Sequence, residues 1–506
     1  MSALAERSAE LRLGPLLAGF AEIPAERDVP VQGLALDSRA VHAGYLFLAL
    51  RGHDHHGLKH LAEARTRGAR AVAYDPAGAD AYLPVPAGLP AFPVSALGEK
   101  TGYLAARFYA DPSAHARVVA VTGTSGKTSV AALTAQLLTG LGRPCGLIGT
   151  LGYGVYGTPL APAPYTTPDA VQLQAWLARF RDRQVRHVSM EASSHALDQG
   201  RLNGVQLRAA AFTNLSRDHL DYHGTLAAYA AAKRRLFELP GLAAAVVNLD
   251  DAFGRELAAA LAADVQLFGY TLESSTLPRG RVLSAGPLSL HAGGMRFEVQ
   301  GDYGAGTVET TLLGRFNVYN LLAVLGLLLA LDVPFGAALA ALGTARTVPG
   351  RMQCFGGGAG APLVVVDYAH KPDALEKALT AARTHCQGEL WCVFGCGGER
   401  DRGKRPQMAA IAERLADHVI VTDDNPRHED GDVIVQEILA GLHAAGKVQV
   451  ERERARAIAA AISAAASGDV VLVAGKGHET YQLVGDRRMP FSDTEVVVKL
   501  LAEVQA

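Results

Sequence analysis

The segment VVAVTGTSGKTS, residues 118–129, decides the fold of this chain. It joins a run of β-branched residues to a glycine-rich turn and then to a helix-forming segment from Lys127 to about Gly140, an order that predicts a strand, a phosphate-binding loop and a helix. Gly123 and Gly126 allow main-chain N–H groups to converge on an anion, and the positive end of the helix dipole faces the same point. The segment therefore predicts a P-loop in an α/β protein.

Side chains of the loop add to this cradle. Lys127 supplies a point charge, and the hydroxyls of Thr128 and Ser129 can hold a magnesium ion. The alternative is an ordinary glycine-rich turn, because Val121 stands where the wider G-x-x-x-x-G-K-[ST] pattern has its first glycine. The strand before the loop and the helix after it favour phosphate binding.

Length and composition limit the remaining choices. A chain of 506 residues is too long for one core and predicts three domains, at about 100 to 200 residues each. Its 48 Lys and Arg residues nearly balance its 50 Asp and Glu residues, so no global field attracts nucleic acid or an anionic membrane. The five cysteines lack paired spacing, the N-terminus lacks a signal-peptide pattern, and no uncharged apolar stretch reaches about 18 residues. We expect a cytoplasmic protein without a membrane span.

Residues 1–112 form the first predicted domain, a small α/β unit. Its expected ligand contacts are two polar turns beside apolar strands, Asp37-Ser38-Arg39 and the histidine-rich stretch 52–57. These histidines are adjacent rather than at metal-ligand spacing, so a small ligand is favoured over a metal. Strands are expected at 34–36, 45–50, 71–74 and 91–94, and helices at 58–67 and 97–109.

Residues 113–345 repeat strands and helices, which predicts a central parallel sheet with crossover helices. Glu191 and His219 follow two of its strands, at the edge where open α/β sheets bind ligands. They offer oxygen and nitrogen ligands to a magnesium ion, although each alone could be a satisfied polar residue at a strand end. Strands are expected at 118–121, 146–149, 187–190, 209–213 and 245–249, and antiparallel ribbons from about 266 to 313.

Residues 346–506 predict a second open α/β sheet, similar in architecture to a Rossmann domain. Cys392 and Cys396 flank the end of one strand and are predicted to be core residues. A dinucleotide-dependent dehydrogenase is excluded, because the segment FGCGG at 394–398 lacks the third glycine of G-x-G-x-x-G. Strands are expected at 363–367, 390–394, 418–421 and 470–474, with polar ends at 367–373, 395–405, 423–427 and 475–479.

Taken in order, these stretches resemble the Mur ligase family, and within it the synthetases that add the third residue of the peptidoglycan stem peptide. The resemblance runs from about Asp37 to Asp493 and rests on the ordered motifs GTSGKT, MEASSHALDQGR, TNLSRDHLDYHG, GRFNVYN, VPGRMQ, DYAHKPDALE, FGCGGERDRGKRP, DDNPR and GKGHE. It implies a UDP-binding first domain, a central ATPase domain and a C-terminal domain that binds the amino acid. Ser125, Gln353 and Gly224-Thr225-Leu226 depart from the usual pattern, and none of these departures removes an expected ligand.

The implied reaction joins an amino acid to UDP-N-acetylmuramoyl-L-alanyl-D-glutamate through an acyl phosphate, with ATP and Mg²⁺, and serves cell-wall synthesis, cell shape and cell division. Amide formation requires the carboxylate oxygen to become a better leaving group, so a phosphate cradle beside a carboxylate site is the minimum equipment. The resemblance assigns catalysis to Lys127, Glu191, His219 and Lys233, and metal binding to Thr128, Glu191, His219 and Lys233. It assigns ATP to Gly123, Thr124, Ser125, Gly126, Lys127, Thr128, Asn317 and Arg351. It assigns the UDP-substrate to Leu36, Ser38, His53, Thr166, Thr167, Ser193, Gln199 and Arg201.

Lys233 matches the lysine that the family carries as a carbamate, N6-carboxylysine. By itself its surroundings indicate only a basic helix surface. A carbamate would turn the cation into an anion able to hold a second magnesium ion. The amine must be neutral to react with carbon dioxide, so we expect Arg234 and Arg235 to lower its pKa.

The resemblance also implies the amino acid, which we expect to be meso-2,6-diaminopimelate, with a monomeric enzyme. Arg427 follows a proline-stiffened turn and could pair bidentately with the far carboxylate, while Glu479 is expected to be free to accept from the ammonium. A buried guanidinium without its carboxylate would cost a few kcal/mol, roughly a hundredfold discrimination against lysine. The alternative is a surface Arg427 paired with Glu429 or Asp430. The amino-acid set is Arg400, Asp424, Asn425, Pro426, Arg427, Gly475 and Glu479.

Other functions stay open at this point. Within the family they are another Mur ligase, folylpolyglutamate synthetase, or the same ligase using L-lysine or L-ornithine. Outside it, the chain could be a regulatory P-loop NTPase whose C-terminal sheet binds a protein partner. Release of phosphate from ATP separates these, because a ligase requires both the UDP-sugar-peptide and an amino acid.

Overall fold

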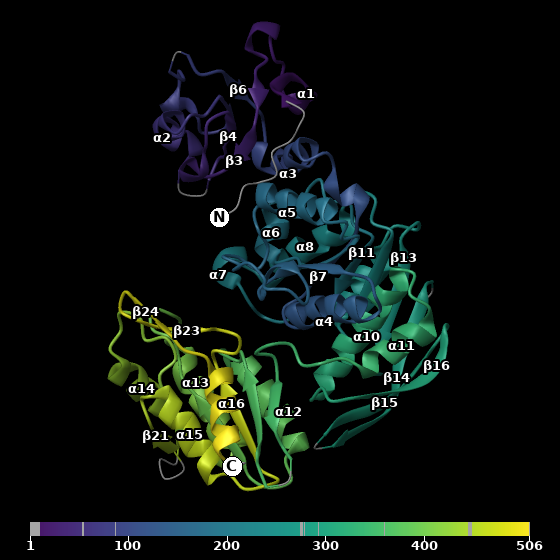
Figure 1. Ribbon diagram of the computed structural model, residues 1–506, viewed down its shortest axis with the longest axis vertical. Helices are drawn as coiled ribbons and strands as arrows, with labels where there is room; N and C mark the ends of the chain where they lie inside the picture. The colour runs from purple at the N-terminus through teal and green to yellow at the C-terminus, as the bar shows by residue number, and fades with distance from the viewer. Residues whose placement is uncertain are drawn as a thin grey trace. The chain divides into compact units, whose positions relative to one another are not determined.

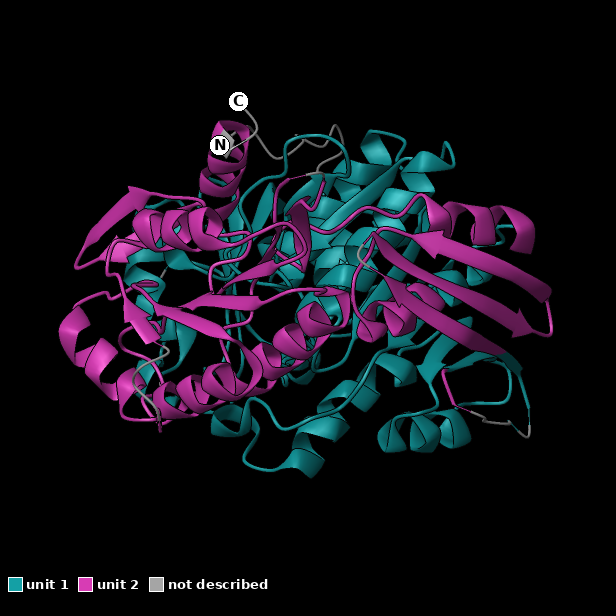
Figure 2. Cartoon of the chain, turned by 90° about the horizontal axis from the view of Figure 1, so that it is seen from below, with its two compact units in different colours: residues 1–271, 275–282, 323–334 teal, residues 272–274, 283–322, 335–506 magenta. Residues whose placement is uncertain are grey.

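The computed structural model describes residues 11–52, 55–86, 88–273, 277, 279–291, 293–358, 360–443 and 448–504 (Figure 1). The chain forms two compact units (Figure 2). Unit 1 comprises residues 1–271, 275–282 and 323–334, and unit 2 comprises residues 272–274, 283–322 and 335–506. The predicted α/β fold class is confirmed, with three mainly parallel sheets. The predicted domain limits at 112 and 345 stay predictions. None of the described helices is long and apolar enough to cross a membrane.

The first sheet belongs to unit 1 and has four parallel strands in the order β3-β4-β5-β6. The predicted helix at 58–67 is a 3-10 turn, Gly57–His60, followed by a short α-helix. The strands are β3 (Gly33–Ala35), β4 (Tyr45–Ala49), β5 (Ala71–Tyr74) and β6 (Ala91–Pro93), with the ribbon β1 (Leu11–Arg12) and β2 (Pro30–Val31). The helices are α1 (Leu13–Leu17), α2 (Leu61–Thr66) and α3 (Leu97–Phe108).

The central sheet of unit 1 runs β9-β8-β10-β7-β11-β12-β13, and only β9 is antiparallel to its neighbour. Its parallel strands bury both faces, as continuous apolar runs predict. The strands are β7 (Arg117–Thr122), β8 (Cys145–Gly149), β9 (Gly152–Val155), β10 (His187–Glu191), β11 (Ala209–Phe212), β12 (Ala244–Asn248) and β13 (Gln266–Thr271). The helices are α4 (Lys127–Gly140), α5 (Ala170–Asp182), α6 (Ser194–Asp198), α7 (Leu220–His223), α8 (Leu226–Arg234) and α9 (Ala252–Ala260).

The region after residue 266 corrects one prediction. β13 pairs parallel to β12 instead of joining an antiparallel ribbon, because its buried run LFGYT continues the core of the parallel sheet. The antiparallel strands are confirmed from β14 (Arg281–His291) onward, through β15 (Gly294–Gly301) and β16 (Gly304–Thr310). Two helices follow, α10 (Arg315–Ala330) and α11 (Phe335–Gly343).

The C-terminal sheet of unit 2 has the order β17-β18-β22-β19-β20-β21 and is parallel except for the edge strand β17. Cys392 and Cys396 lie in its core, as predicted, and all five cysteines are free thiols. The strands are β17 (Gln353–Gly356), β18 (Leu363–Asp367), β19 (Leu390–Phe394), β20 (His418–Val421), β21 (Val448–Val450), β22 (Val470–Ala474) and the hairpin β23 (Tyr481–Val484) and β24 (Arg487–Pro490). The helices are α12 (Pro372–His385), α13 (Lys404–Leu415), α14 (Gly431–Leu439), α15 (Arg454–Ala464) and α16 (Asp493–Val504).

Candidate active site

The P-loop joins β7 to α4, as the sequence predicts. Gly123 has φ 147° and Gly126 has φ 87°, backbone conformations that favour glycine. A Cβ atom at Gly123 would lie 1.9 Å from Thr213 Oγ1, so a larger residue has no room there. Lys127 Nζ donates to the carbonyl oxygens of Gly123 at 2.8 Å and Thr124 at 3.0 Å, which folds its ammonium back over the loop. The main chain forms a turn that can hold an anion.

Two residues after β11 support the P-loop, and sequence reasoning did not include them in the site. Asn214 accepts from Ser125 N at 3.0 Å and donates to Ser125 O at 3.1 Å. Thr213 Oγ1 donates to Ser125 O at 2.6 Å. Because these bonds join segments about ninety residues apart, the strand order of the sheet creates them and no local pattern could have revealed them.

The candidate magnesium ligands Thr128 and Glu191 lie together. Thr128 Oγ1 donates to Glu191 Oε2 at 2.9 Å, and Thr150 N donates to Glu191 Oε1 at 2.7 Å. Only 2% of Glu191 is exposed. A hydroxyl and a carboxylate at the end of a P-loop suit a hard cation such as Mg²⁺. Within the described ranges, no group of three or more His, Cys, Asp or Glu residues is arranged to hold a metal ion.

Lys233 is buried beneath the same loop, with 1% of the residue exposed. Its Nζ donates to Gly123 O at 2.8 Å and lies 4.2 Å from the centre of the Tyr229 ring. Burial lowers the pKa of Lys233 well below its ordinary value, and the charge of Lys127 lowers it further. The lowered pKa agrees with the requirement for a neutral amine.

The expected cause of that lowered pKa is wrong. Arg234 lies 3.7 Å from Glu256, and Arg235 lies 3.3 Å from Asp198, so both guanidinium groups have carboxylate partners. Neither is among the causes that lower the pKa of Lys233. The burial of one helix face against the loop produces the effect, and the charges of the sequence neighbours do not.

His219 stands at the start of α7 with φ 52°, a left-handed conformation that is uncommon outside glycine. Its side chain is 43% exposed, its Nε2 lies 3.6 Å from Asp218 Oδ2, and its ring lies edge-on to His195 at 4.9 Å. The ring is therefore accessible to a ligand. Joint binding of a metal ion by His219 and Glu191 stays a prediction.

Four of the five residues expected to hold the sugar-peptide portion form one bonded cluster. Thr167 Oγ1 donates to Glu191 O at 2.9 Å and accepts from Ser193 N at 3.1 Å. Arg201 donates to Thr167 O at 2.8 Å and to Gln199 Oε1 at 2.9 Å. The fifth, Thr166, lies beside it, with its Oγ1 3.3 Å from Thr150 Oγ1. An unbroken series of bonds therefore links Thr128 of the P-loop, through Glu191 and Thr167, to Arg201.

The uridine contacts expected in the first domain receive less support. Ser38 is buried and donates to Glu63 Oε2 at 2.7 Å, so its hydroxyl already has a partner. Leu36 is half-buried directly after β3. His53 lies outside the described residues. In the same histidine-rich stretch, His56 is buried, and its Nε2 lies 2.8 Å from Asp75 O.

A cavity of about 510 Å³ lies at the opposite end of the central sheet from the P-loop, near the first residues of β7 and β10. Arg117 and Arg143 line it, and both donate to Leu331 O, at 3.1 and 3.0 Å. Arg117 also pairs with Asp332 at 2.6 Å. These arginines satisfy carbonyl groups at the C-terminal end of α10, so the cavity is not part of the candidate site.

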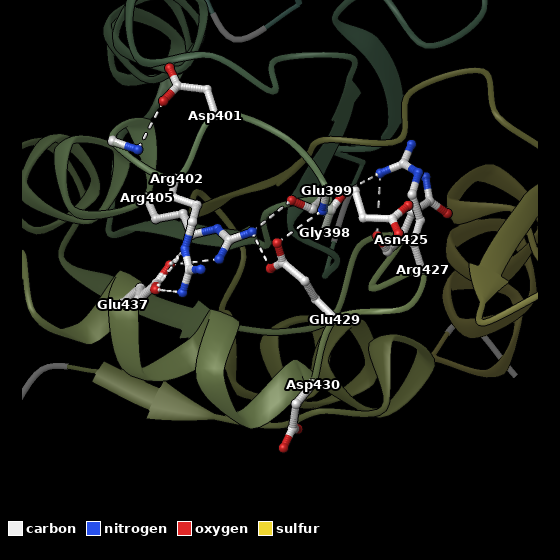
Figure 3. Close-up of polar contacts among 12 residues, drawn as sticks. Gly398, Glu399, Asp401, Arg402, Arg405, Asn425, Arg427, Glu429, Asp430 and Glu437 are labelled. Carbon is white, nitrogen blue, oxygen red and sulfur yellow. Dashed lines mark hydrogen bonds and ion pairs between the residues drawn. The ribbon is translucent and has the colours of Figure 1, made fainter.

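In unit 2, Arg427 follows β20 and has φ 54°. Its backbone N donates to Leu483 O at 3.0 Å, and Gly485 N donates to its carbonyl oxygen at 2.7 Å, so the β23–β24 hairpin holds the turn. Its Nη1 donates to Gly398 O at 2.8 Å. The surface pairing considered from the sequence is wrong: Glu429 pairs with Arg405, and Asp430 points away from Arg427 and caps α14 (Figure 3).

A buried lysine, Lys476, contacts several of the residues expected to bind the amino-acid substrate. The sequence analysis did not include this lysine in the site. Lys476 has no exposed side-chain surface, and its Nζ lies 3.0 Å from Asn425 Oδ1, 3.1 Å from Glu479 Oε2 and 3.5 Å from Asp424 Oδ1. Asn425 Nδ2 also donates to Glu479 Oε2 at 2.9 Å. Glu479 therefore already bonds Lys476 and Asn425, and its contact with a ligand ammonium stays a prediction. The GKGHE motif was visible, but the burial of its lysine was not.

The other expected unit 2 residues have varied surroundings. Arg400 is exposed, and a Cβ atom at Gly397 would lie 3.6 Å from Arg400 Cγ and 2.9 Å from Arg427 Nη1, so both arginines border this glycine. Gly475 has φ 119°, and Pro426 is buried in the turn. Asn317 is buried and donates to Leu313 O at 2.8 Å. The Arg351 guanidinium lies 4.8 Å from the centre of the Tyr368 ring.

Known proteins match the chain over nearly its whole length. It is 53% identical over 480 residues to UDP-N-acetylmuramoyl-L-alanyl-D-glutamate--2,6-diaminopimelate ligase of Xanthomonas campestris pv. campestris (strain 8004), covering 95% of this chain and 96% of that protein. The protein of the same name from Pseudomonas aeruginosa is 50% identical over 479 residues, covering 94% and 96%. A solved structure of a ligase of that name has a TM-score of 0.73 and 35% identity, covering 98% and 100%. MurF from Acinetobacter baumannii shares the fold alone, with a TM-score of 0.61, 19% identity, and 98% and 99% coverage.

The fold and the P-loop define an α/β protein built to hold a phosphate group. Models of protein families match in the order of the sheets: Mur ligase family, catalytic domain, at residues 30–109; Mur ligase middle domain at 121–328; and Mur ligase, glutamate ligase domain, at 350–477. The chain belongs to the Mur ligase family. The resemblance identified from the ordered motifs is confirmed.

Proposed function

We propose that this protein is an ATP-dependent ligase that adds meso-2,6-diaminopimelate to UDP-N-acetylmuramoyl-L-alanyl-D-glutamate in peptidoglycan precursor synthesis. The observation that carries the proposal is the series of hydrogen bonds from Thr128 to Arg201. It connects a phosphate cradle to a polar cluster at the C-terminal edge of the same sheet, which is where an open α/β sheet binds its ligands. The names of relatives about 50% identical to this chain support the same reaction.

The proposed reaction has two steps. A carboxylate oxygen of the UDP-substrate attacks the γ-phosphorus of ATP, which gives an acyl phosphate and ADP. The amine of the amino acid then attacks the acyl carbon, the amine loses a proton, and phosphate leaves as the amide forms. Lys127 and the main-chain N–H groups after Gly123 stabilise negative charge on the transferred phosphoryl group, and Arg201 helps to hold the UDP-substrate.

We infer that Mg²⁺ is the metal cofactor. The oxygen donors of Thr128 and Glu191 fit this ion, and His219 would add a nitrogen ligand. A carboxylated Lys233 would hold a second Mg²⁺. When bound, Mg²⁺ would neutralise phosphate charge. The buried, low-pKa amine of Lys233 favours carbamate formation, because the neutral amine is the form that reacts with carbon dioxide.

The choice of amino acid rests on unit 2. Arg427 and Arg400 border Gly397 and offer two guanidinium groups to the far carboxylate of diaminopimelate, which lysine lacks. Lys476 and Asn425 hold Glu479, and in this proposal its carboxylate accepts from an ammonium group of the amino acid. We further propose that Asn317 and Arg351 contact the nucleotide, that the enzyme is monomeric and cytoplasmic, and that residues 1–112, 113–345 and 346–506 bind the UDP-substrate, ATP and the amino acid.

The decisive experiment measures phosphate release from ATP by the purified full chain. Three incubations contain ATP and Mg²⁺ with UDP-N-acetylmuramoyl-L-alanyl-D-glutamate alone, with meso-diaminopimelate alone, or with both. We expect steady phosphate release only in the incubation that contains both substrates. Mass spectrometry should then detect one UDP-tripeptide for each phosphate released. Phosphate release that does not depend on the two substrates would instead support a regulatory NTPase.

A further inference from the structure

We propose that Arg405, on α13, is a positioning residue for diaminopimelate recognition. By holding the 397–399 loop and the 425–429 turn at a fixed separation, it places Arg427 for its carboxylate. This inference rests on the proposed function and extends it to a residue that does not itself need to touch the substrate.

Arg405 bridges three segments from a buried position (Figure 3). None of its side-chain surface is exposed. Its Nη2 donates to Glu429 Oε2 at 2.6 Å and to Gly397 O at 3.2 Å, and its Nη1 donates to Glu437 Oε2 of α14 at 2.6 Å. One rigid guanidinium therefore connects the loop after β19, the turn after β20 and helix α14.

The loop and the turn also bond directly to each other, on the side where Arg427 lies. Gly398 N donates to Asn425 O at 2.9 Å, and Arg427 Nη1 donates to Gly398 O at 2.8 Å. Glu429, which Arg405 holds, accepts from Glu399 N at 3.1 Å. A shift of the 397–399 loop would therefore move the acceptor that orients the Arg427 guanidinium.

The physical chemistry of this contact requires an arginine. A guanidinium presents several N–H groups in a fixed plane, so it can serve three acceptors at once, whereas a lysine ammonium is a compact charge on a flexible stem. Arg405 has two carboxylate partners, and charge-assisted bonds to both offset the cost of burying it. Such outer contacts fix the geometry of the groups that bind a ligand, in the way that outer partners orient metal ligands.

The test compares Arg405→Lys with the unmodified protein at saturating ATP and UDP-substrate. We measure kcat/KM for meso-diaminopimelate and for L-lysine, and divide the first value by the second. Because a displaced binding group costs far more than a lost remote contact, we expect the ratio to fall at least about tenfold, mainly through a higher KM for diaminopimelate. The KM for ATP should stay within about twofold.

The ratio distinguishes positioning from a purely structural role. Partial unfolding lowers the active fraction equally for both amino acids, so it cancels in the ratio. A ratio within about twofold of the unmodified value, with only a lower melting temperature, would overturn the proposal. If Arg405→Lys does not fold, Glu429→Gln weakens the same link from the partner side and should lower the ratio in the same direction.

Arg402→Lys is the matched control. Arg402 also donates to Glu437 Oε1, at 2.9 Å, but its side chain is 60% exposed and this contact does not join the 397–399 loop to the 425–429 turn. We expect its ratio to be unchanged. Failure of the proposed function would look different, because the unmodified protein would then show no preference for diaminopimelate. If Arg427→Ala loses the preference for diaminopimelate but Arg405→Lys keeps it, the positioning role of Arg405 is rejected while the proposed function stands.

Discussion

The P-loop of unit 1 and the residues of unit 2 that we propose bind the amino-acid substrate are held in place by different kinds of contact. The P-loop takes its shape from the main chain, through Gly123 and Gly126, and from bonds between its backbone and Asn214. The residues proposed to bind the amino-acid substrate are held by buried charged side chains, chiefly Lys476 and Arg405. A site built from backbone tolerates changes at exposed side chains but not at its glycines, whereas a site built from side chains depends on partners distant in sequence.

The largest effect is expected when Lys127, the charged side chain of the P-loop, is removed. Lys127→Ala should lower the rate of phosphate release about a thousandfold or more, because the transferred phosphoryl group loses its cation. The fold should remain, since the Lys127 side chain contacts loop carbonyls rather than a core. Circular dichroism and the melting temperature serve as the control. A variant with more than half the normal rate would show that the loop does not act on ATP.

Lys233→Met should also remove most activity, by about a hundredfold. Methionine fills similar volume but has no amine to form a carbamate, so added bicarbonate should not restore the rate. The same variant tests the lowered pKa of Lys233. At pH values between the lowered pKa and about 10.4, the Lys233 amine without a carbamate is mostly protonated in the unfolded state and mostly neutral in the folded state. The unfolded state then binds more protons, so the free energy of unfolding should rise with pH in this range.

In bicarbonate-free buffer, Lys233→Met should lack this rise in the free energy of unfolding, which urea titration at several pH values measures. Equal pH dependence in both proteins would contradict the lowered pKa. Crystal density at neutral pH decides the carbamate itself, because acidification removes carbamates. A plain ammonium beside a bound metal ion would refute it.

Arg427→Ala should have a selective effect on unit 2. We expect kcat/KM for meso-diaminopimelate to fall about a hundredfold, because the far carboxylate loses a charged partner, while ATP affinity stays unchanged. Arg487→Ala, at the exposed tip of the β23–β24 hairpin, is the matched control and should retain full activity. Similar kcat/KM values for lysine and diaminopimelate in the unmodified protein would reject this reading of Arg427.

The same contrast explains which features the sequence could predict. Strands β18, β19, β20 and β22 begin and end where expected, because each is a buried apolar run bounded by polar residues. Helix α4 also spans the predicted residues. The short strands β9, β17 and β21 and the β23–β24 hairpin were not predicted. Each is only three or four residues long, and β24 is fully exposed, so they carry little periodic signal.

The residues that organise the site were the hardest to predict. Local pattern identified the P-loop, and the ordered motifs identified Glu191 and Arg427. The positions of Asn214, Lys476 and Arg405 depend on partners 89, 51 and 24 residues away, respectively. A lysine or arginine in a sequence is expected at the surface, so its complete burial appears only when the sheet brings the partners together.

The smallest expected effect is at Ser125, one of the positions that depart from the usual family pattern. Ser125 is exposed, and its bonds to Thr213 and Asn214 use its backbone N and O atoms rather than its hydroxyl. Ser125→Asn keeps these backbone atoms and should therefore change kcat and the KM for ATP by less than about twofold. Gly123→Ala, two residues earlier, is the matched contrast. Its Cβ would lie 1.9 Å from Thr213 Oγ1 at φ 147°, so ATP binding should be lost. Titration with a fluorescent ATP analogue measures both variants, and equal affinities would show that the main chain does not determine this site.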